Sequence, residues 1–185
     1  GAYSGVMHIA VISPAAGSGA RYLQTGGMRS KIDEDLGGKP VLQRAVELFT
    51  KHDLVRTIVV AGPHDPEAFA EFKQRHGDRL GLLGAVICKG GKTHRWETVK
   101  AALELVPTDA THIAVHDGAR PATPAELIDR VFELAERFAG VVPALEVTDT
   151  LKRVTTTSEP ERRSDDAVSA ILGMGEDADT ASSLR

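Results

Sequence analysis

Apolar runs and amphipathic stretches alternate along most of this chain. Residues 8–13 form a continuous apolar run that ends at a proline and small residues, which is typical of a strand buried on both faces. Similar runs predict strands over residues 55–61, 84–88, 111–115 and 140–145. Apolar positions at helical spacing between these runs predict helices over residues 40–49, 66–75, 98–106 and 124–138.

This alternation predicts an α/β fold. Strands separated by helices of about ten to fifteen residues form right-handed crossovers, and the result is a mainly parallel sheet covered by helices on both faces. Ligands of such sheets bind at the carboxyl ends of the strands. Residues 154–185 are polar and turn-prone apart from a short apolar patch at 168–174, so we expect an excursion from the core there.

The composition is that of a globular chain with one main domain. Of the 185 residues, 42% are hydrophobic and 26% charged, and the net charge is −4. A negative net charge argues against a nucleic-acid-binding surface over the whole protein but allows a local basic pocket. Cys88 is the single cysteine, and no stretch reaches the roughly 18 apolar residues of a membrane span. We therefore expect a cytoplasmic protein without a membrane partner.

A glycine-rich loop over residues 14–21 follows the first predicted strand directly. Small residues allow successive backbone N–H groups to approach phosphate oxygens, and Arg21 adds a cation. The loop lacks the Gly-Lys-Ser/Thr ending of a P-loop and the third glycine of a dinucleotide fingerprint. Lys31 can fold back onto the same phosphates as a point charge. The alternatives are a tight turn without a ligand and a solvated surface lysine.

Residues 116–121 place an acid and a base at the carboxyl end of another buried strand. Asp117 is there a candidate ligand for Mg²⁺, which prefers carboxylate and phosphate oxygens. Arg120, three residues later, can bind an acceptor phosphate through two parallel hydrogen bonds. The alternative is an Asp117–Arg120 ion pair that stabilises a turn.

Two glycines in residues 90–99 follow a third predicted strand and precede a helix. The backbone at Gly91 and the hydroxyl of Thr98 can contact a base or a ribose. A simple strand-to-helix turn is the alternative. For His94 and Trp96 we favour a solvated ring and surface packing, respectively.

Together, residues 15–21 with Lys31, residues 90–99, residues 116–121 and residues 149–152 resemble the 2-C-methyl-D-erythritol 4-phosphate cytidylyltransferase family. The matching segments run in order from about residue 9 to residue 153. The resemblance implies an enzyme that joins CTP to methylerythritol phosphate and releases pyrophosphate in the non-mevalonate isoprenoid pathway. It also implies a Rossmann-like fold and a homodimer with a protruding β-arm. We expect a nucleotide-binding core at 7–145, the arm at 146–170 and a polar tail at 171–185.

The resemblance assigns a role to each matching residue. Arg21 and Lys31 are similar to the catalytic pair that stabilises charge on the α-phosphate. Asp117 and Arg120 correspond to positions facing the Mg²⁺ ion and the acceptor phosphate, and Thr150 to an arm residue that contacts the acceptor in the other subunit. The remaining matches correspond to nucleotide-binding positions: Ala15, Ala16, Gly17, Gly19, Gly91 and Thr98.

Some features depart from the family pattern and keep alternatives open. Gly118 stands where the family prefers alanine, and the later Thr-Pro-Gln and Thr-Asp-Asp/Glu-Ala-Ser segments are absent. Either the natural chain continues or the acceptor half of the site is degenerate. Ribitol 5-phosphate is therefore an alternative acceptor. A non-catalytic nucleotide-binding module is a second alternative, and a dinucleotide-binding domain is a third, because acidic residues 33–35 lie near the position of a ribose ligand.

Overall fold

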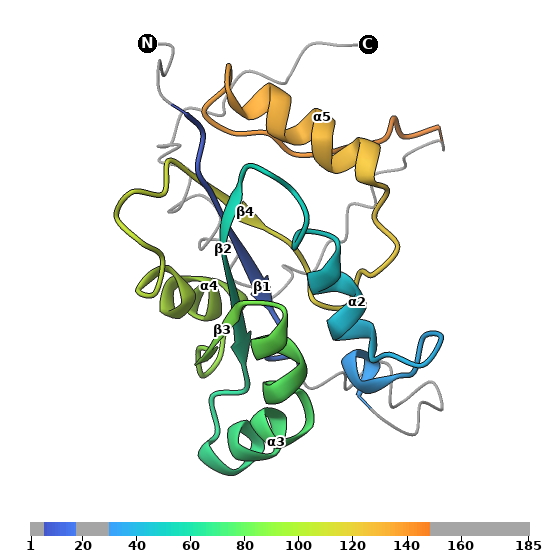
Figure 1. Cartoon of the computed structure of the whole chain (residues 1–185), viewed down its shortest axis with the longest axis vertical. Helices are drawn as coiled ribbons and strands as arrows, with labels where there is room; N and C mark the ends of the chain where they lie inside the picture. Colours follow the sequence, from blue (N-terminus) through green and yellow to red (C-terminus); the bar gives the residue numbers. More distant parts are fainter. Residues whose placement is uncertain (1–5, 18–29, 149–185) are drawn as a thin grey trace, which may run out of the picture. The chain divides into compact units, whose positions relative to one another are not determined.

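A computed structural model describes residues 6–17 and 30–148 (Figure 1). The chain divides into two units, residues 1–144 and residues 145–185, and every helix and strand below lies in the first. The predicted arm and tail fall almost entirely outside the described residues, so the domain boundaries stay predictions. No helix within the described ranges is both long and apolar enough to cross a membrane.

Four parallel strands form the sheet: β1 (Ile9–Pro14), β2 (Val55–Gly62), β3 (Ala85–Lys89) and β4 (His112–Val115). Their order is β3-β2-β1-β4, so β1 lies between β2 and β4. All six residues of β1 are buried, as its continuous apolar run predicts. The register places Val11 beside Ile58 on one side and Ala114 on the other. The predicted α/β class is confirmed.

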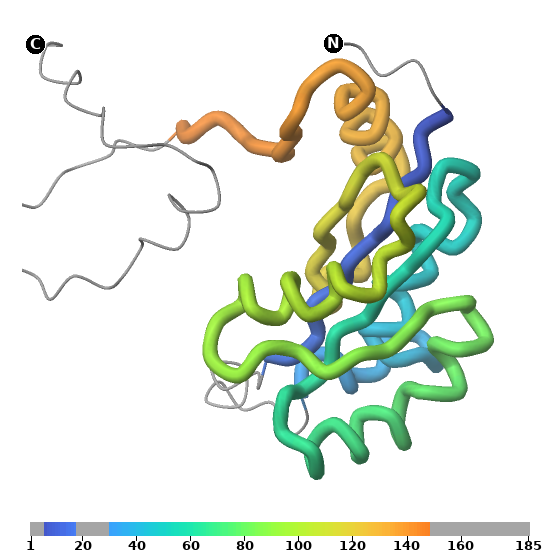
Figure 2. Tube along the Cα trace, turned by 90° about the vertical axis from the view of Figure 1, so that its left-hand side faces the viewer, coloured from blue at the N-terminus to red at the C-terminus, as the bar shows by residue number. Residues whose placement is uncertain are grey.

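Helices cover both faces of this sheet (Figure 2). They are η1 (Lys31–Asp33, a 3₁₀ helix), α2 (Val41–Glu47), α3 (Pro66–Leu82), α4 (Arg95–Leu103) and α5 (Ala125–Ala135). The larger core contains Leu42 of α2, Phe72 of α3 and Phe132 of α5, which pack with alternate sheet residues. A smaller core, with Ala102 of α4, covers the opposite face. The crossovers therefore place helices on both sides, as predicted.

All four helices differ from their predicted bounds, and α2 and α5 are shorter at both ends. Helix α3 continues from Arg75 to Leu82, and Leu80 in this extra stretch is fully buried. Helix α4 begins at Arg95 rather than at Thr98. The carboxylate of Glu97 accepts hydrogen bonds from the N–H groups of Thr93 and His94, at 2.7 and 3.0 Å, and thereby caps the first turn.

The strand predicted over residues 140–145 is wrong, since the structure has no regular element there. Pro143 has no N–H group to donate to a ladder. Gly140, Val141 and Pro143 instead line a cavity beside β4. Most of this segment is exposed, with Val142 at 85% and Leu145 at 94%. An apolar run therefore does not by itself establish a buried strand.

Candidate functional site

The loops that follow β1, β3 and β4 meet at the carboxyl edge of the sheet. The N–H of Gly118 donates to the carbonyl of Pro14 at 3.3 Å, which joins the β4 and β1 loops. A Cβ atom added at Gly90 would lie 3.0 Å from that of Ala16, so the β3 loop touches the β1 loop as well. The sequence prediction that these motifs share one edge is therefore confirmed.

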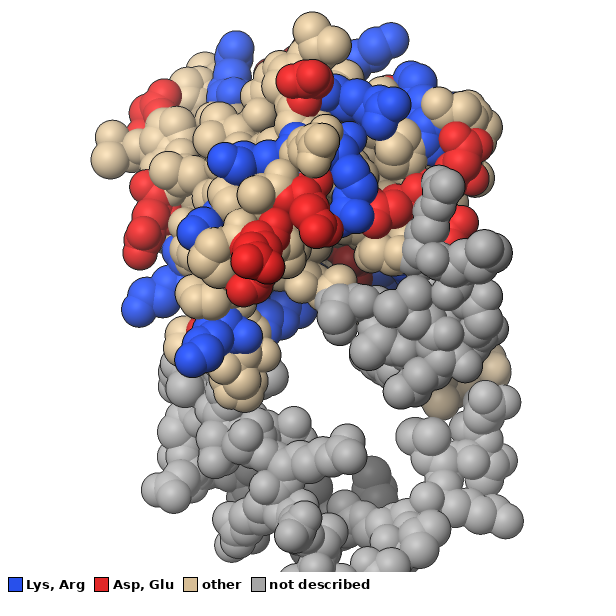
Figure 3. Space-filling model, turned by 90° about the horizontal axis from the view of Figure 1, so that it is seen from below, with Lys and Arg blue, Asp and Glu red and all other residues tan. Residues whose placement is uncertain are grey.

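Seen from this edge, basic and acidic side chains are interspersed on the described surface (Figure 3). The view shows no single block of one charge. On the described part of this edge, positive charge for a phosphorylated ligand therefore comes from particular side chains and backbone N–H groups rather than from a broad basic patch.

The β1 loop supplies small residues to the edge. Ala15 is buried at 4% exposure, Ala16 is half-buried, and Gly17 is exposed. No atom of the described residues lies within 4 Å of the position that a Cβ atom would take at Gly17. This space is what the approach of a phosphate group requires. Gly19 and Arg21 lie outside the described residues, and their predicted roles stay predictions.

Gly91 and Thr98 are brought together, but they bond to each other. The N–H of Gly91 donates to the Thr98 hydroxyl at 3.0 Å, and Thr98 is 3% exposed. The hydroxyl still has its own proton to donate. A Cβ atom at Gly91 would lie 2.1 Å from that of Glu97, so the β3 loop folds closely against the start of α4. Thr98 therefore holds the shape of the Gly91 loop.

We predict that Gly91→Ala disrupts this loop. The added methyl group clashes with the backbone and Cβ of Glu97, and overpacking of this kind costs roughly 1–3 kcal/mol. The free energy of unfolding in urea and a CTP titration should both show the loss. Gly77→Ala, in the interior of α3 with open space around it, is the matched control and should be neutral or slightly stabilising. Unchanged CTP binding in Gly91→Ala would remove this loop from the site.

Asp117 lies between two arginines directly after β4. Its Oδ2 is 3.4 Å from Arg95 Nη1 and 3.6 Å from Arg120 Nε. Burial tends to raise the pKa of Asp117, but the N–H of Ala119 and the two guanidinium groups outweigh burial and hold this pKa below its usual range. The Asp117–Arg120 ion pair considered from the sequence is thus present. The Asp117 carboxylate is ionised at neutral pH and available to a cation.

Arg95 is the site residue that the sequence analysis missed. It is the first residue of α4 and lies three positions before Thr98. Residues three apart in a helix lie on one face, so the expected role of Thr98 could have indicated Arg95. Its side chain is 59% exposed, and ion pairs at such exposure stabilise a protein by only about 0–1 kcal/mol. An incoming phosphate can therefore compete with Asp117 for this guanidinium group.

The remaining predicted positions have simple surroundings. Lys31 is exposed at the start of η1. Trp96 is 40% exposed with its ring stacked near that of His94, at 6.4 Å between centroids, which agrees with the surface packing expected for it. Thr150 lies outside the described residues. Among the described residues no cluster of three or more His, Cys, Asp or Glu side chains could hold a metal, so Asp117 stands as a single candidate ligand.

His116 precedes Asp117 and points away from the carboxyl edge. Its Nε2 lies 3.0 Å from the Thr123 hydroxyl, and its ring meets that of Phe49 edge to face at 4.9 Å. Nδ1 has no hydrogen-bond partner among the described residues. Burial lowers the pKa of His116, although the charge of Asp117 opposes the shift. The ring is therefore neutral near pH 7.

We predict that stability decreases as the pH falls through the histidine range. Burial lowers the pKa of both His76 and His116 in the folded protein, whereas an unfolded histidine titrates near 6.5. Below about pH 6.5 the unfolded chain thus binds more protons than the folded one, and the free energy of unfolding falls. Urea denaturation at several pH values between 8 and 5 measures how the free energy of unfolding depends on pH. His116→Gln should flatten the slope; an unchanged slope in this variant would contradict the assignment.

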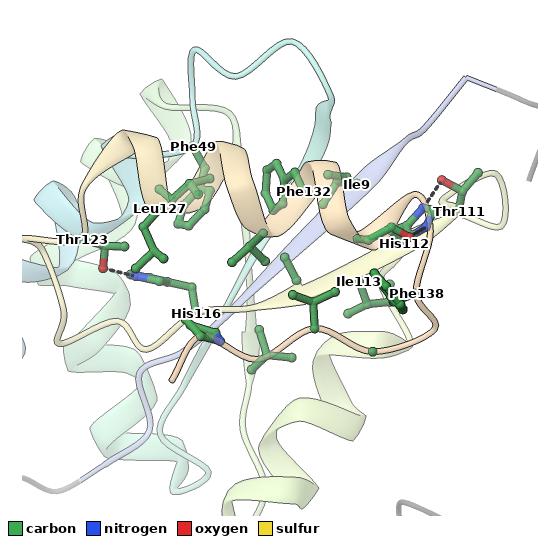
Figure 4. Close-up of a pocket in the computed structure, with 18 of the residues that line it drawn as sticks. Ile9, Phe49, Thr111, His112, Ile113, His116, Thr123, Leu127, Phe132 and Phe138 are labelled. Atoms are coloured by element: carbon green, nitrogen blue, oxygen red, sulfur yellow. Dashed lines mark hydrogen bonds between the residues drawn. The ribbon is translucent and has the colours of Figure 1, made fainter. Parts of the chain in front are cut away.

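A cavity of about 480 Å³ lies between β4, α5 and residues 138–143 (Figure 4). Figure 4 shows apolar side chains around it, among them Ile9, Leu127 and Phe132. His116 and Thr123 are joined at its edge. Neither the described part of the glycine-rich loop, residues 14–17, nor Asp117, Arg95 or Arg120 lines it. The groups suited to phosphate chemistry are therefore at the carboxyl edge and not in this cavity.

Comparison with known proteins agrees with the site. A model of the family 2-C-methyl-D-erythritol 4-phosphate cytidylyltransferase (IspD) matches residues 9–166. The enzyme of that name from Bacteroides thetaiotaomicron is 35% identical over 149 residues, which are 80% of this chain and 65% of that one. The one from Frankia casuarinae is 38% identical over 148 residues, 79% of this chain and 51% of that one. The chain thus spans between half and two thirds of these relatives.

Solved structures support the fold. A crystal structure of 4-diphosphocytidyl-2C-methyl-D-erythritol synthase is 28% identical with a TM-score of 0.58 and covers 84% of this chain and 67% of its own. The synthase from Anaerococcus prevotii has a TM-score of 0.63 at 22% identity, over 80% of this chain and 60% of its own, and supports the fold alone. With the family match over most of the sequence, the chain belongs to the 2-C-methyl-D-erythritol 4-phosphate cytidylyltransferase family.

Proposed function

We propose that the protein transfers the CMP group of CTP to 2-C-methyl-D-erythritol 4-phosphate and releases pyrophosphate. The observation that carries this proposal is that the family match spans the three loops that meet at the carboxyl edge. An oxygen of the acceptor phosphate forms a bond to the α-phosphorus of CTP. The bond from that phosphorus to the bridging oxygen breaks, and pyrophosphate leaves with the electron pair.

Positioning and positive charge supply most of the acceleration in such a transfer. We assign the charge growing at the α-phosphate to Arg21 and Lys31. The β1 loop binds the triphosphate through backbone N–H groups. The Gly91 loop, whose N–H groups at Gly91, Thr93 and His94 are already bonded within the protein, supplies the contact surface for the base and ribose. No general base is needed, because the nucleophile is already an ionised phosphate oxygen.

Asp117 suits Mg²⁺ as a protein ligand. Mg²⁺ is commonly held by one or two carboxylates together with substrate phosphates and water, so a lone carboxylate at this edge is sufficient. Its lowered pKa keeps it ionised, and its two arginine partners are exposed enough to move. When bound, the metal would neutralise phosphate charge. A homodimer in which Thr150 contacts the partner's acceptor, and the cytoplasmic location, stay predictions.

Pyrophosphate release from CTP and Mg²⁺, measured on the full-length protein, tests the proposal. Methylerythritol phosphate and ribitol 5-phosphate are compared in parallel. We expect turnover with methylerythritol phosphate. Turnover with ribitol phosphate alone would change the acceptor. Tight CTP binding without turnover on either acceptor would leave a non-catalytic nucleotide-binding module.

We predict that Arg120→Ala weakens acceptor binding more than CTP binding. Loss of a hydrogen bond to a charged group costs about 1.5–3 kcal/mol, which corresponds to a rise in the acceptor KM of about tenfold to a hundredfold. Steady-state kinetics with each substrate varied in turn measures both constants. Arg130→Ala, an exposed arginine on α5, is the control. Equal losses for both substrates would contradict this division of roles.

A further inference from the structure

A buried polar pair ties the 3₁₀ helix that carries Lys31 to helix α3. The Oδ1 atom of Asp33 lies 2.6 Å from Nε2 of His76, 43 positions away in sequence. The two side chains are 12% and 3% exposed. Arg75 Nε is 3.8 Å from the same carboxylate oxygen, and its side chain is half-exposed. The shortest contact of Asp33 is therefore with the imidazole.

His76 occupies a core position of its helix. Phe72, His76 and Leu80 recur at intervals of four, and all three are buried. The imidazole ring lies 5.0 Å from that of Phe72. A polar group in such a place destabilises the fold unless it is hydrogen-bonded. Asp33 supplies that bond, so the pair cannot separate without leaving a buried donor unpaired.

The protonation state of the His76 ring is suited to donating a hydrogen bond to Asp33. Burial lowers the pKa of His76, with further lowering by Arg75 and Arg79, while the bond to Asp33 and its charge oppose the shift. A neutral ring carries one proton, and an ionised carboxylate only accepts. The proton is therefore on Nε2, which donates to Asp33. The bond fixes the direction of the Asp33 side chain as well as its distance.

Helix η1 has few restraints of its own. It is three residues long, and Ser30, the residue just before it, makes no side-chain capping bond. The N–H of Asp33 donates to the carbonyl of Ser30 at 2.8 Å and closes the turn, and Ile32 is buried at 9% exposure. Lys31 is one residue from Ile32 and two from Asp33. In so short a turn, fixing these two side chains fixes where the Lys31 side chain starts.

We propose that His76 is a positioning residue for Lys31, acting through Asp33. This inference rests on the proposed function, in which Lys31 stabilises charge at the α-phosphate. His76 lies on α3, and its hydrogen bond and ring contact in the described structure are with Asp33 and Phe72. Through Asp33 it determines how well Lys31 is held. A displacement of about 1 Å at a charged catalytic group can cost on the order of a hundredfold in rate.

The test compares a variant that keeps the donor with one that removes it. His76→Gln places an amide N–H near the position of Nε2, whereas His76→Leu fills the space without a donor. We expect His76→Leu to lower kcat by about tenfold to a hundredfold with the KM for CTP within about threefold, and His76→Gln to recover most of the loss. Asp33→Asn and Asp33→Ala form a second pair in case His76→Leu fails to fold.

Hydrogen exchange at the Asp33 amide gives a readout without substrate. This N–H closes the η1 turn, so its protection should be lost in His76→Leu and kept in His76→Gln. A wild-type protein without turnover would refute the proposed function, and the exchange rates would still test the anchor. Normal kcat in folded His76→Leu, or equal losses in the Gln and Leu variants, would overturn the positioning role.

Discussion

Replacing Lys31 with alanine is expected to lower kcat by about 10²–10³-fold, equivalent to about 3–4 kcal/mol of transition-state stabilisation. Lys31 is exposed on η1, so its ammonium group is free of the core and its removal should leave the fold intact. The charge that it would neutralise grows on the α-phosphate only in the transition state, as the acceptor oxygen bonds to the α-phosphorus. The loss should therefore appear in kcat, with a smaller change in the KM for CTP.

The control for this variant is another exposed lysine. Lys51→Ala removes the same charge at a position just after α2, and it should turn over CTP at the wild-type rate. Circular dichroism and the free energy of unfolding establish that both variants are folded. If Lys31→Ala had near-normal kcat, Lys31 would not belong to the mechanism, and the inference about His76 would fall with it.

The sequence predicted the sheet well because its signal is local. A strand buried on both faces, such as residues 9–14, must be a continuous apolar run, and such a run is visible without any structure. The incorrect strand prediction at residues 140–145 also comes from relying on a local signal. Whether an apolar run forms a strand depends on a neighbour with free N–H and C=O groups, and that neighbour is specified elsewhere in the chain.

The sequence predicts those residues of the candidate site whose place depends only on the course of the backbone. Gly91 and Asp117 lie at the ends of strands, so the parallel topology brings them to one edge. Contacts between side chains distant in sequence were not predictable. The approach of Arg95 to Asp117 and of His76 to Asp33 depends on how α4 and α3 pack on the sheet. In the sequence, an arginine at a helix start or a histidine at a core position does not indicate which distant side chain it contacts.

Asp117→Asn distinguishes the two interpretations of Asp117, because they predict opposite effects of Mg²⁺. As a metal ligand, the carboxylate assists CTP only when Mg²⁺ is present. Without the metal it repels the triphosphate and competes with it for Arg95, at 3.4 Å. Unit charges about 4 Å apart near a protein surface interact with roughly 1–4 kcal/mol. We therefore expect the variant to bind CTP at least as tightly as the wild type when Mg²⁺ is removed by a chelator.

With saturating Mg²⁺ the same variant should lose turnover by about 10²-fold or more, because several kcal/mol of transition-state stabilisation depend on a correctly placed metal. CTP titrations with and without Mg²⁺, together with kcat as a function of Mg²⁺ concentration, measure both effects. Asp78→Asn, an exposed aspartate on α3, controls for the change in net charge. If Asp117→Asn kept the wild-type dependence on Mg²⁺ and lost only stability, Asp117 would serve to hold the β4 loop through its arginine pairs. The metal would then have to be bound by substrate phosphates and water without it.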